Sequence, residues 1–292
     1  MLFIALCVTV AVLCWAMTAV LVILLWRGLN PLVSRLSPGL AADCVFLLEI
    51  LPLLTSATVV SLFVIPGYVV WEPAQTEERI SLWLAGACSF ALLLILTVGA
   101  RLYRELKRRP VVSQDRPFIA VLGCLRQKIV VNDAAQRLLN RDELRAVLRH
   151  EAAHVDRRDN FRLLATRVIS MLTLNPRAWK EMESTRAHFT EFAADSFAVT
   201  DERSALDLAQ ALVKVARDFS PAEYQFASSL LPRGDSIQER VLHLLNRQAQ
   251  PGSNASYLAV FAVLMLALIL FAALHHDLQY FCYQGLEWLV SF

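Results

Sequence analysis

Four long apolar runs constrain this chain more than any other feature of its sequence. They are Leu2–Trp26, Cys44–Trp71, Ile80–Ala100 and Tyr257–Leu274, and the one charged residue within them is Glu49. Each run is near or above the roughly 18 residues that a helix needs to cross a bilayer. Because lipid offers the backbone no hydrogen-bond partners, a spanning segment of this kind must be helical. The sequence therefore predicts four transmembrane helices.

Charge divides the chain into apolar ends and a polar middle. Of the 28 Lys and Arg residues, 25 lie in 101–256 together with 19 acidic residues, a local balance of +6. Hydrophobic residues make up 57% of the chain, which argues against an all-soluble globular protein. A mild positive excess beside a membrane fits contact with anionic lipid headgroups, and it is too mixed to indicate direct nucleic acid binding. The six cysteines form no CxxC pair, so neither a disulfide framework nor a cysteine zinc site is predicted.

The basic residues also predict an orientation, because basic loops stay in the cytoplasm. Arg27 and Arg35 follow the first apolar run, loop 72–79 is mainly acidic, and five basic residues open the segment after the third run. The N-terminus is therefore expected outside the cell, and the C-terminal tail with it. The first run lacks a basic start and is too long for a cleaved signal peptide. The sequence thus predicts three parts. Residues 1–109 hold three helices, at about 2–26, 44–71 and 80–100, and a cytoplasmic basic linker. Residues 110–256 form a cytoplasmic domain, and residues 257–292 hold a fourth helix and a short tail outside the cell.

Glu49 is an ionisable residue inside a membrane run, and such residues are functional candidates by default. Its position near the cytoplasmic end of the run leaves three interpretations open: a structural partner, a side chain that reaches the membrane surface, or a gating group. Pro52 and Pro66 are expected to kink the same helix.

The polar middle is predicted to be a mixed α+β domain. Short strands are expected at Phe118–Leu122 and Lys128–Val131, with a turn between them. Asn140 and Glu143 stand at capping-box spacing before a helix expected at 141–158, where apolar residues recur with helical period. Further helices are expected at about 161–174, 178–199 and 204–219 and from about 236 onward. The predicted fold class is thus mainly α, with multi-pass transmembrane helices and an inserted α+β domain.

The predicted helix at 141–158 carries the sequence HEAAH, from His150 to His154. Histidines at i and i+4 project from one helical face and can bind one zinc ion together. Glu151 lies beside them, close enough to act on a zinc-bound water. The motif falls on an independently predicted helix, in frame with its apolar face, which adds to its weight.

A catalytic zinc site also needs a third protein ligand. The extended pattern HExxHxxGxxH is absent, because Arg157 takes the glycine position and Asn160 the last histidine position. The helix at 178–199 offers EFAAD, in which Glu191 can bind zinc. Asp195, one turn later, can accept the outer N–H of a ligating histidine.

These motifs resemble those of the gluzincin membrane peptidases. One branch comprises the beta-lactam-sensing antirepressor peptidases of bacteria (BlaR/MecR type), and another the CAAX prenyl protease and HtpX-type quality-control peptidases. The antirepressor branch is the more similar one, on the stretch KIVVNDAAQRLLNRDELRAVLRHEAAHVDRRDN followed by NPRAW and EFAAD. The order of three membrane helices, protease domain and fourth helix is also more similar to that branch. The antirepressor receptors carry a large extracellular penicillin-binding domain after the last helix, which is not found up to Phe292, so beta-lactam sensing is not carried over.

The resemblance implies a zincin-like domain in a bacterial inner-membrane zinc endopeptidase, with one Zn²⁺ per chain and Glu151 as the catalytic base. It suggests regulated proteolysis of a cytoplasmic or membrane-adjacent protein, such as a transcriptional repressor, and leaves room for a separate sensor protein. Arg240 and His188 are candidates for substrate or transition-state contacts, and the strand near 118–122 for pairing with an extended substrate. Three alternatives stay open: a processing or quality-control protease of the CAAX/HtpX kind, a non-catalytic zinc-binding signalling scaffold, and a transporter with a chance motif.

Overall fold

The computed structural model describes residues 2–71, 82–107, 117–170, 176–218 and 234–246, together with Tyr280 and Gln284. Over these residues the protein is mostly helical with one small sheet. The helices are α1 (Leu2–Val33), α2 (Pro38–Val59), α3 (Ile65–Trp71), α4 (Leu82–Lys107), α5 (Asp133–Leu138), α6 (Arg141–Asp156), α7 (Asp159–Ser170), α8 (Pro176–Ala198), α9 (Glu202–Asp218) and α10 (Gly234–Leu245). The strands are β1 (Ile119–Leu122) and β2 (Lys128–Val131), and a π-helical turn, Val60–Val64, joins α2 to α3.

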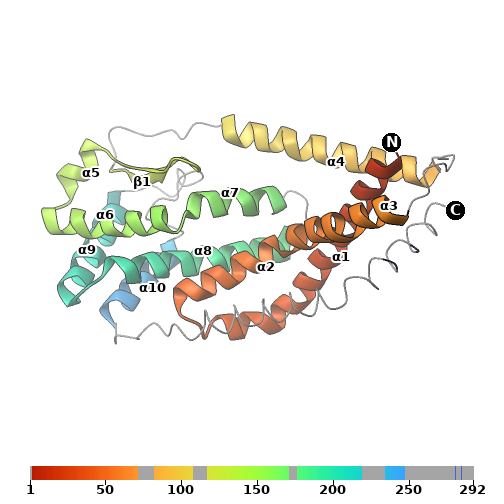
Figure 1. Ribbon diagram of the computed structural model, residues 1–292. Helices are drawn as coiled ribbons and strands as arrows, with labels where there is room; N and C mark the ends of the chain where they lie inside the picture. The colour runs from red at the N-terminus through yellow and green to blue at the C-terminus, as the bar shows by residue number, and fades with distance from the viewer. Residues whose placement is uncertain are drawn as a thin grey trace.

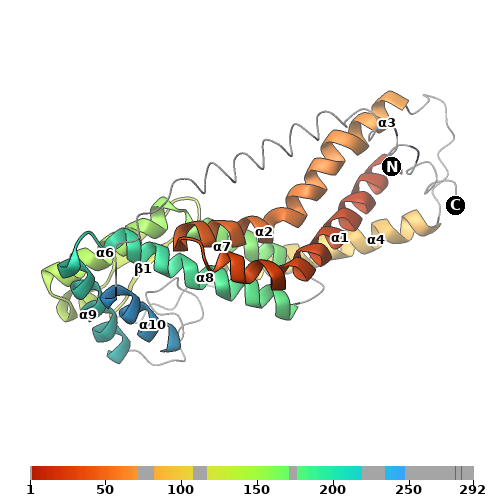
Figure 2. The same ribbon diagram turned by 90° about the horizontal axis from the view of Figure 1, so that it is seen from below.

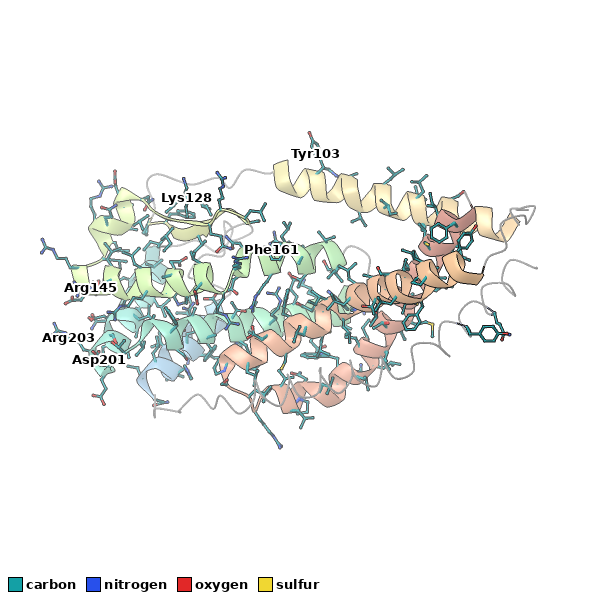
Figure 3. The ribbon with its side chains drawn as sticks, in the orientation of Figure 1. Tyr103, Lys128, Arg145, Phe161, Asp201 and Arg203 are labelled. Carbon is teal, nitrogen blue, oxygen red and sulfur yellow. The ribbon has the colours of Figure 1, made fainter. Side chains whose placement is uncertain are left out.

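The described parts form an elongated molecule. α5, α6, α9, α10 and the sheet gather at one end, α1, α3 and α4 lie toward the other, and α7 and α8 connect the two regions alongside α2 (Figure 1). The end far from the apolar helices is rich in charge: Arg145, Asp201 and Arg203 lie there, whereas Tyr103 points outward from α4 (Figure 3). The charged middle of the sequence and its apolar helices thus lie at opposite ends of the molecule.

The first two apolar runs form a helical hairpin that is longer than predicted. The sequence predicted a loop from about 27 to 43, but α1 continues through Pro31 to Val33, and α2 already begins at Pro38. Proline favours the first turn of a helix because its fixed φ suits that position and its missing N–H is not needed there. Arg27 therefore lies on helix α1, and only a short turn around Arg35 separates the two helices.

The second run is helical without a break from Pro38 to Trp71, but its hydrogen-bond pattern changes once. The N–H of Ile65 donates to the carbonyl of Val60, five residues earlier, at the end of the π-helical turn. This turn ends two residues before Pro66, which has no N–H for the ordinary i−4 bond. π-Bulges are among the causes of helix kinks, and the α2–α3 rod changes direction along its length (Figure 2). The expected irregularity is thus present next to Pro66.

Two described helical segments, Leu6–Val33 and Pro38–Tyr68, are long and apolar enough to cross a membrane. The third predicted run corresponds to α4, where the apolar stretch among the described residues is Ala91–Ala100. The fourth predicted helix at 257–274, the acidic loop at 72–79 and nearly all of the outer tail lie outside the described residues. Length and apolarity thus indicate membrane association.

The predicted elements of the polar middle are confirmed in type and approximate position. β1 and β2 pair antiparallel, with Ile119 opposite Val131. The Asn140 side chain accepts the backbone N–H of Glu143, and the Glu143 side chain accepts that of Asn140, which completes the capping box. The short helix α5 was not predicted; Asn132 caps it by accepting the N–H of Ala135. Helices α6 and α9 pack around a core that includes Val147, Leu208 and Leu212.

The α1–α2 hairpin packs directly on helices α7 and α8. Trp26 and Val45 of the hairpin share a buried core with Ile169 of α7 and Trp179 and Met182 of α8. Since these contacts are apolar and fully buried, they join the hairpin and the polar domain into one packed unit.

Glu49 has a structural partner in this interface. Its carboxylate is fully buried and accepts a hydrogen bond from Nε of Arg186 on α8 at 2.7 Å. Arg186 also donates to the Thr166 hydroxyl of α7 at 3.1 Å. Of the three interpretations left open, the structure places Glu49 in a structural pair rather than at the membrane surface.

Replacing Glu49 by glutamine is expected to lower the free energy of unfolding by about 1–3 kcal/mol. The amide keeps an acceptor for Arg186 but leaves that buried cation without a counter-charge. Thermal unfolding of the full chain in detergent measures the effect, with Glu181→Gln on the exposed side of α8 as a matched control. Equal stability of the Glu49 variant and the control would contradict this role.

Candidate metal centre

Helix α6 supplies two histidines to one buried point. His150 and His154 lie one turn apart, are 0% and 3% exposed, and their Nε2 atoms are 3.1 Å apart. The helix buries this face because its apolar residues recur with the same period as the histidines. The i, i+4 spacing predicted that the two imidazoles would lie together on one face of the helix, and they do.

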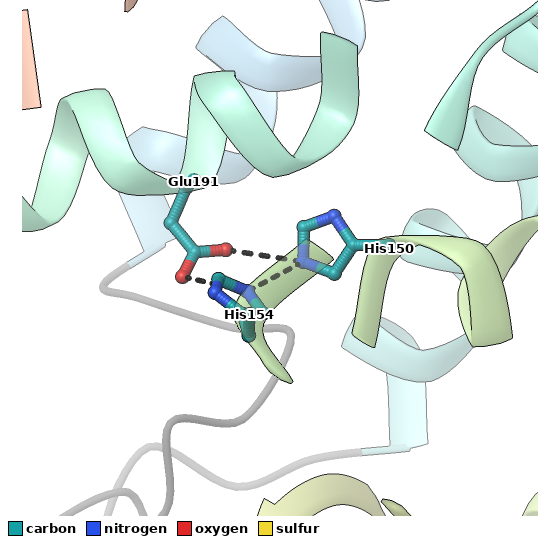
Figure 4. Close-up of side chains that lie close together, drawn as sticks. All are labelled: His150, His154 and Glu191. Carbon is teal, nitrogen blue, oxygen red and sulfur yellow. Dashed lines mark hydrogen bonds and ion pairs between the residues drawn. The ribbon is translucent and has the colours of Figure 1, made fainter. Parts of the chain in front are cut away.

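Glu191 of α8 faces both imidazoles across the helix interface. Its two carboxylate oxygens lie 3.5 Å from Nε2 of His150 and 3.8 Å from Nε2 of His154, and the side chains converge from the two helices (Figure 4). One ligand atom from each of the three residues lies within 4.8 Å of the others. Buried Ala194 on α8 and Ala153 on α6 have side chains small enough for such a close approach.

The outer ring nitrogens of both histidines are held by carboxylates. His150 Nδ1 lies 2.9 Å from Asp195 Oδ1, as the sequence predicted for a ligating histidine. His154 Nδ1 lies 2.8 Å from Asp159 Oδ2. In a neutral imidazole, a carboxylate at Nδ1 favours the tautomer that is protonated there, which frees the Nε2 lone pair to bind a metal ion. Both histidines are thus oriented as metal ligands are.

Sequence reasoning considered Asp159 as a cap or brace of the motif helix or as a solvated surface acid, and did not predict its contact with His154. Asp159 follows the end of α6 by three residues and reaches His154 only because the chain turns sharply there. Arg158 makes this turn with a φ of 54°, in the left-handed region that non-glycine residues seldom adopt. The sequence shows no glycine at this position, so the turn gave no local signal. The acid five residues after His154 was the only indication.

Arg240 of α10 lies in the site, fully buried. Its guanidinium donates two hydrogen bonds to Asp195, at 2.7 and 2.6 Å, and its Nη1 is 2.9 Å from Glu191 Oε2. These contacts brace two carboxylates of α8 from behind the histidines. The bidentate geometry is one that arginine forms with carboxylates and lysine cannot.

The charges around the histidines favour a cation. Burial alone would lower the pKa of His150, but the adjacent carboxylates of Asp195 and Glu191 outweigh it and raise the pKa to about 9. For Glu191, burial alone would raise the pKa, but Arg240 and the two histidines lower it to about 2. For Asp195, Arg240 and His150 likewise outweigh burial and hold the pKa well below its usual range. Both carboxylates are therefore ionised at neutral pH.

Glu151 is the most unusual group in the site. It is fully buried, and neither of its carboxylate oxygens has a hydrogen-bond partner within the described part of the chain. Burial raises the pKa of its carboxyl to about 7, an effect that the nearby imidazoles reduce. Buried polar groups without partners are rare and call for a functional explanation.

Two other predicted positions have different surroundings. His188 Nδ1 lies 3.7 Å from Glu239 of α10, and its ring packs on Phe192 at 4.5 Å. These contacts place His188 at the interface between α8 and α10. Asn160, at the position of the missing histidine, donates from Nδ2 to the carbonyls of Val121 and Gly123 at 2.8 and 3.0 Å. Asn160 thus fastens α7 to the β1–β2 turn.

This last contact limits the predicted substrate strand. The carbonyl of Phe118 accepts the N–H of Asn132. In an antiparallel pair, every second residue hydrogen-bonds to the partner strand. The carbonyl of Val121, three residues after Phe118, therefore points away from β2. Asn160 already occupies that carbonyl. An added strand could therefore pair with β1 only ahead of Val121.

The residues present fit a divalent metal. Two imidazole nitrogens and one carboxylate oxygen form a donor set typical of catalytic zinc, and the two outer nitrogens are held as such ligands require. The unpartnered carboxyl of Glu151 adds an acceptor that a site of this kind would use.

Comparison with known proteins gives one finding. Residues 107–248 match the sequence profile of peptidase family M48, a family of metallopeptidases. No curated protein and no solved structure matches the chain. The matched segment contains α6, α8 and α10, which carry the histidines, the two carboxylates and the arginine of the centre. The likeness to peptidase family M48 thus covers the segment of the chain that builds the centre.

Proposed function

We propose that this protein is an integral membrane zinc endopeptidase that cleaves a protein substrate at the cytoplasmic face. One observation carries the proposal: both histidines direct Nε2 toward Glu191 while carboxylates hold their outer nitrogens. A structural zinc site would be closed by four protein ligands, whereas a catalytic site has three and an open position. The buried Glu151 carboxyl supports the catalytic reading.

His150, His154 and Glu191 would hold the zinc ion, which supplies Lewis acidity and lowers the pKa of water to about 7 when bound. Glu151 would take a proton from the attacking water and return it to the leaving amine. Its burial suits this task, since a carboxyl without competing hydrogen bonds is free to accept the proton. Arg240 would act as a positioning residue that holds Glu191 and Asp195, and His188 is retained as a candidate substrate contact at the α8–α10 seam.

The lengths of the helices support the proposed membrane placement. α1 has 32 residues, which corresponds to about 48 Å at 1.5 Å per residue, and the α2–α3 rod is of similar length. A bilayer core is about 30 Å thick, so about 18 Å of each helix would project from it. The projecting ends would be those near Arg27, Arg35 and Asp43, where the hairpin packs on α7 and α8. With basic residues on the inner side, the metal centre would lie in the cytoplasm.

The substrate class proposed is a protein, and regulated proteolysis such as repressor cleavage is the leading role. Processing or quality control of membrane proteins is the alternative, and both share the chemistry above. Comparing the protein termini of cells that express the wild type or Glu151→Gln would separate them. New termini confined to a soluble regulator favour signalling, and termini spread over membrane proteins favour quality control.

Metal analysis tests the proposed function. The purified full chain is expected to hold about one zinc ion, and to cleave fluorescent casein in detergent until a chelator removes the metal. Readdition of zinc should restore cleavage. His154→Ala and Glu191→Ala should lose zinc, whereas His188→Ala should retain it. Stoichiometric zinc that survives both ligand substitutions would refute the assignment of the centre.

A further inference from the structure

The polar contacts around the metal centre extend to the α1–α2 hairpin, a feature that the proposed chemistry does not use. Arg157, the residue that caps the C-terminal end of α6, donates from Nη2 to Asp43 Oδ1 of α2 at 2.8 Å and to the Gly39 carbonyl at 3.3 Å. On its other side, Nε of Arg157 lies 3.8 Å from Asp159 Oδ1. Asp159 in turn holds His154.

We propose that Arg157 is a positioning residue that couples the α1–α2 hairpin to His154 through Asp159, so that zinc retention depends on the contact between Arg157 and Asp43. This inference rests on the proposed function, because it treats His154 as a zinc ligand. It concerns residues 39–43 of the hairpin, more than 100 positions before the motif, which no metal-binding pattern includes.

The fit between α2 and Arg157 is close. Gly39 lies where a Cβ atom would be 3.2 Å from Nη1 of Arg157, a tighter approach than side chains usually tolerate. The absence of a side chain at Gly39 therefore lets the first turn of α2 meet the guanidinium. Arg157 is only partly exposed, at 19% of its side-chain surface, and Asp43 at 25%. Partial burial weakens solvent screening of the pair relative to an exposed one.

The charges support a directed role for Arg157. Asp159 has one oxygen at 2.8 Å from His154 Nδ1 and the other at 3.8 Å from Arg157 Nε. The second distance is an ion pair without a hydrogen bond, so the cation attracts the carboxylate that orients the imidazole. Partners of ligating histidines typically contribute 10- to 100-fold to metal affinity. Arg157 acts one contact further out, and a smaller effect is expected.

The chain contains a matched control on the same aspartate. Arg162 of α7 also pairs with Asp43 and lies over the Phe46 ring of α2 at 5.2 Å. Within the described part of the chain, the Arg162 guanidinium forms its ion pair with Asp43 and not with Asp159. Loss of Arg162 is expected to weaken the contact between α2 and α7 and to leave Arg157 between Asp43 and Asp159. Comparing variants of the two arginines therefore distinguishes the effect of the hairpin's packing on α7 from the effect of the Arg157–Asp159 contact on His154.

The experiment measures the rate at which the zinc-loaded full chain in detergent releases zinc to an excess of a colorimetric chelator. Asp159→Asn should speed release by about 10- to 100-fold, and Arg157→Gln by about 3- to 10-fold. Asp43→Asn should act in the same direction as Arg157→Gln. Arg162→Gln should remain within about twofold of the wild type. Arg157→Lys keeps the charge but loses the planar guanidinium, and its rate of zinc release should lie between those of Arg157→Gln and the wild type. The lysine variant also provides a measurement if the glutamine variant folds poorly.

Two results would overturn the coupling: release from the Arg157 variants at the wild-type rate, or equal acceleration by Arg162→Gln. Failure of the proposed function looks different, because the wild type would then hold no zinc at these residues. A chain that binds zinc through His154, cleaves casein and is indifferent to Arg157 would refute the coupling alone.

Discussion

Replacing Glu151 by glutamine is expected to reduce kcat for casein cleavage by about 10²–10⁴-fold, the usual contribution of a general base. The amide has nearly the shape of the carboxyl but cannot accept the proton. Zinc content should remain that of the wild type, because Glu151 is not among the three residues that converge on the metal position. Cleavage rate and zinc content are measured on the same preparation.

Loss of folding would not explain this result. Both Glu151 oxygens are buried without partners among the described residues, and a neutral amide costs less to bury than a carboxylate. The variant should therefore unfold at the same temperature as the wild type or slightly above it. Glu181→Gln, an exposed acid on α8, is the matched control and should leave cleavage unchanged. Wild-type turnover in the Glu151 variant would eliminate the mechanism and revive the non-catalytic scaffold.

Replacing Arg240 by methionine is expected to lower the free energy of unfolding of the zinc-free protein by about 3–5 kcal/mol. This is the usual cost when one partner of a buried ion pair is removed. The guanidinium has no exposed surface and binds Asp195 and Glu191 at 2.6–2.9 Å, so its loss leaves both carboxylates without their strongest counter-charge. Thermal unfolding of the full chain in detergent measures the effect.

A double variant tests the cause of this loss. Arg240→Met combined with Asp195→Asn removes one buried charge together with its partner, and should recover part of the stability. Zinc should also reduce the deficit, since the cation compensates Glu191. Arg203→Met, at a side chain that is 82% exposed, is the matched control. A single Arg240 variant that unfolds like this control would show that the guanidinium does not balance the site.

Local sequence patterns predicted the elements of the polar domain because the causes of those elements are local. The Asn140 capping box and the apolar period behind it fixed the start of α6. The i, i+4 spacing placed His150 and His154 on one face wherever the helix packs. The prediction of a loop at 27–43 was wrong, because the helices were expected to end where the apolar runs end, at the charged residues Arg27 and Asp43. A helix that leaves the bilayer can carry such residues without interruption, and Pro38 begins the next helix almost at once.

The sequence by itself determined the apolar runs and the HEAAH helix, since each depends on residue type at short spacing, and the EFAAD motif made Glu191 a candidate third ligand. The tertiary structure alone decided that α6, α8 and α10 bring Glu191, Asp195 and Arg240 to the histidines. It alone paired Glu49 with Arg186 and joined Asp43 to Arg157. These contacts link residues 40 to 140 positions apart, and their energy comes from burial in a shared interface, for which no neighbouring residue gives a local signal.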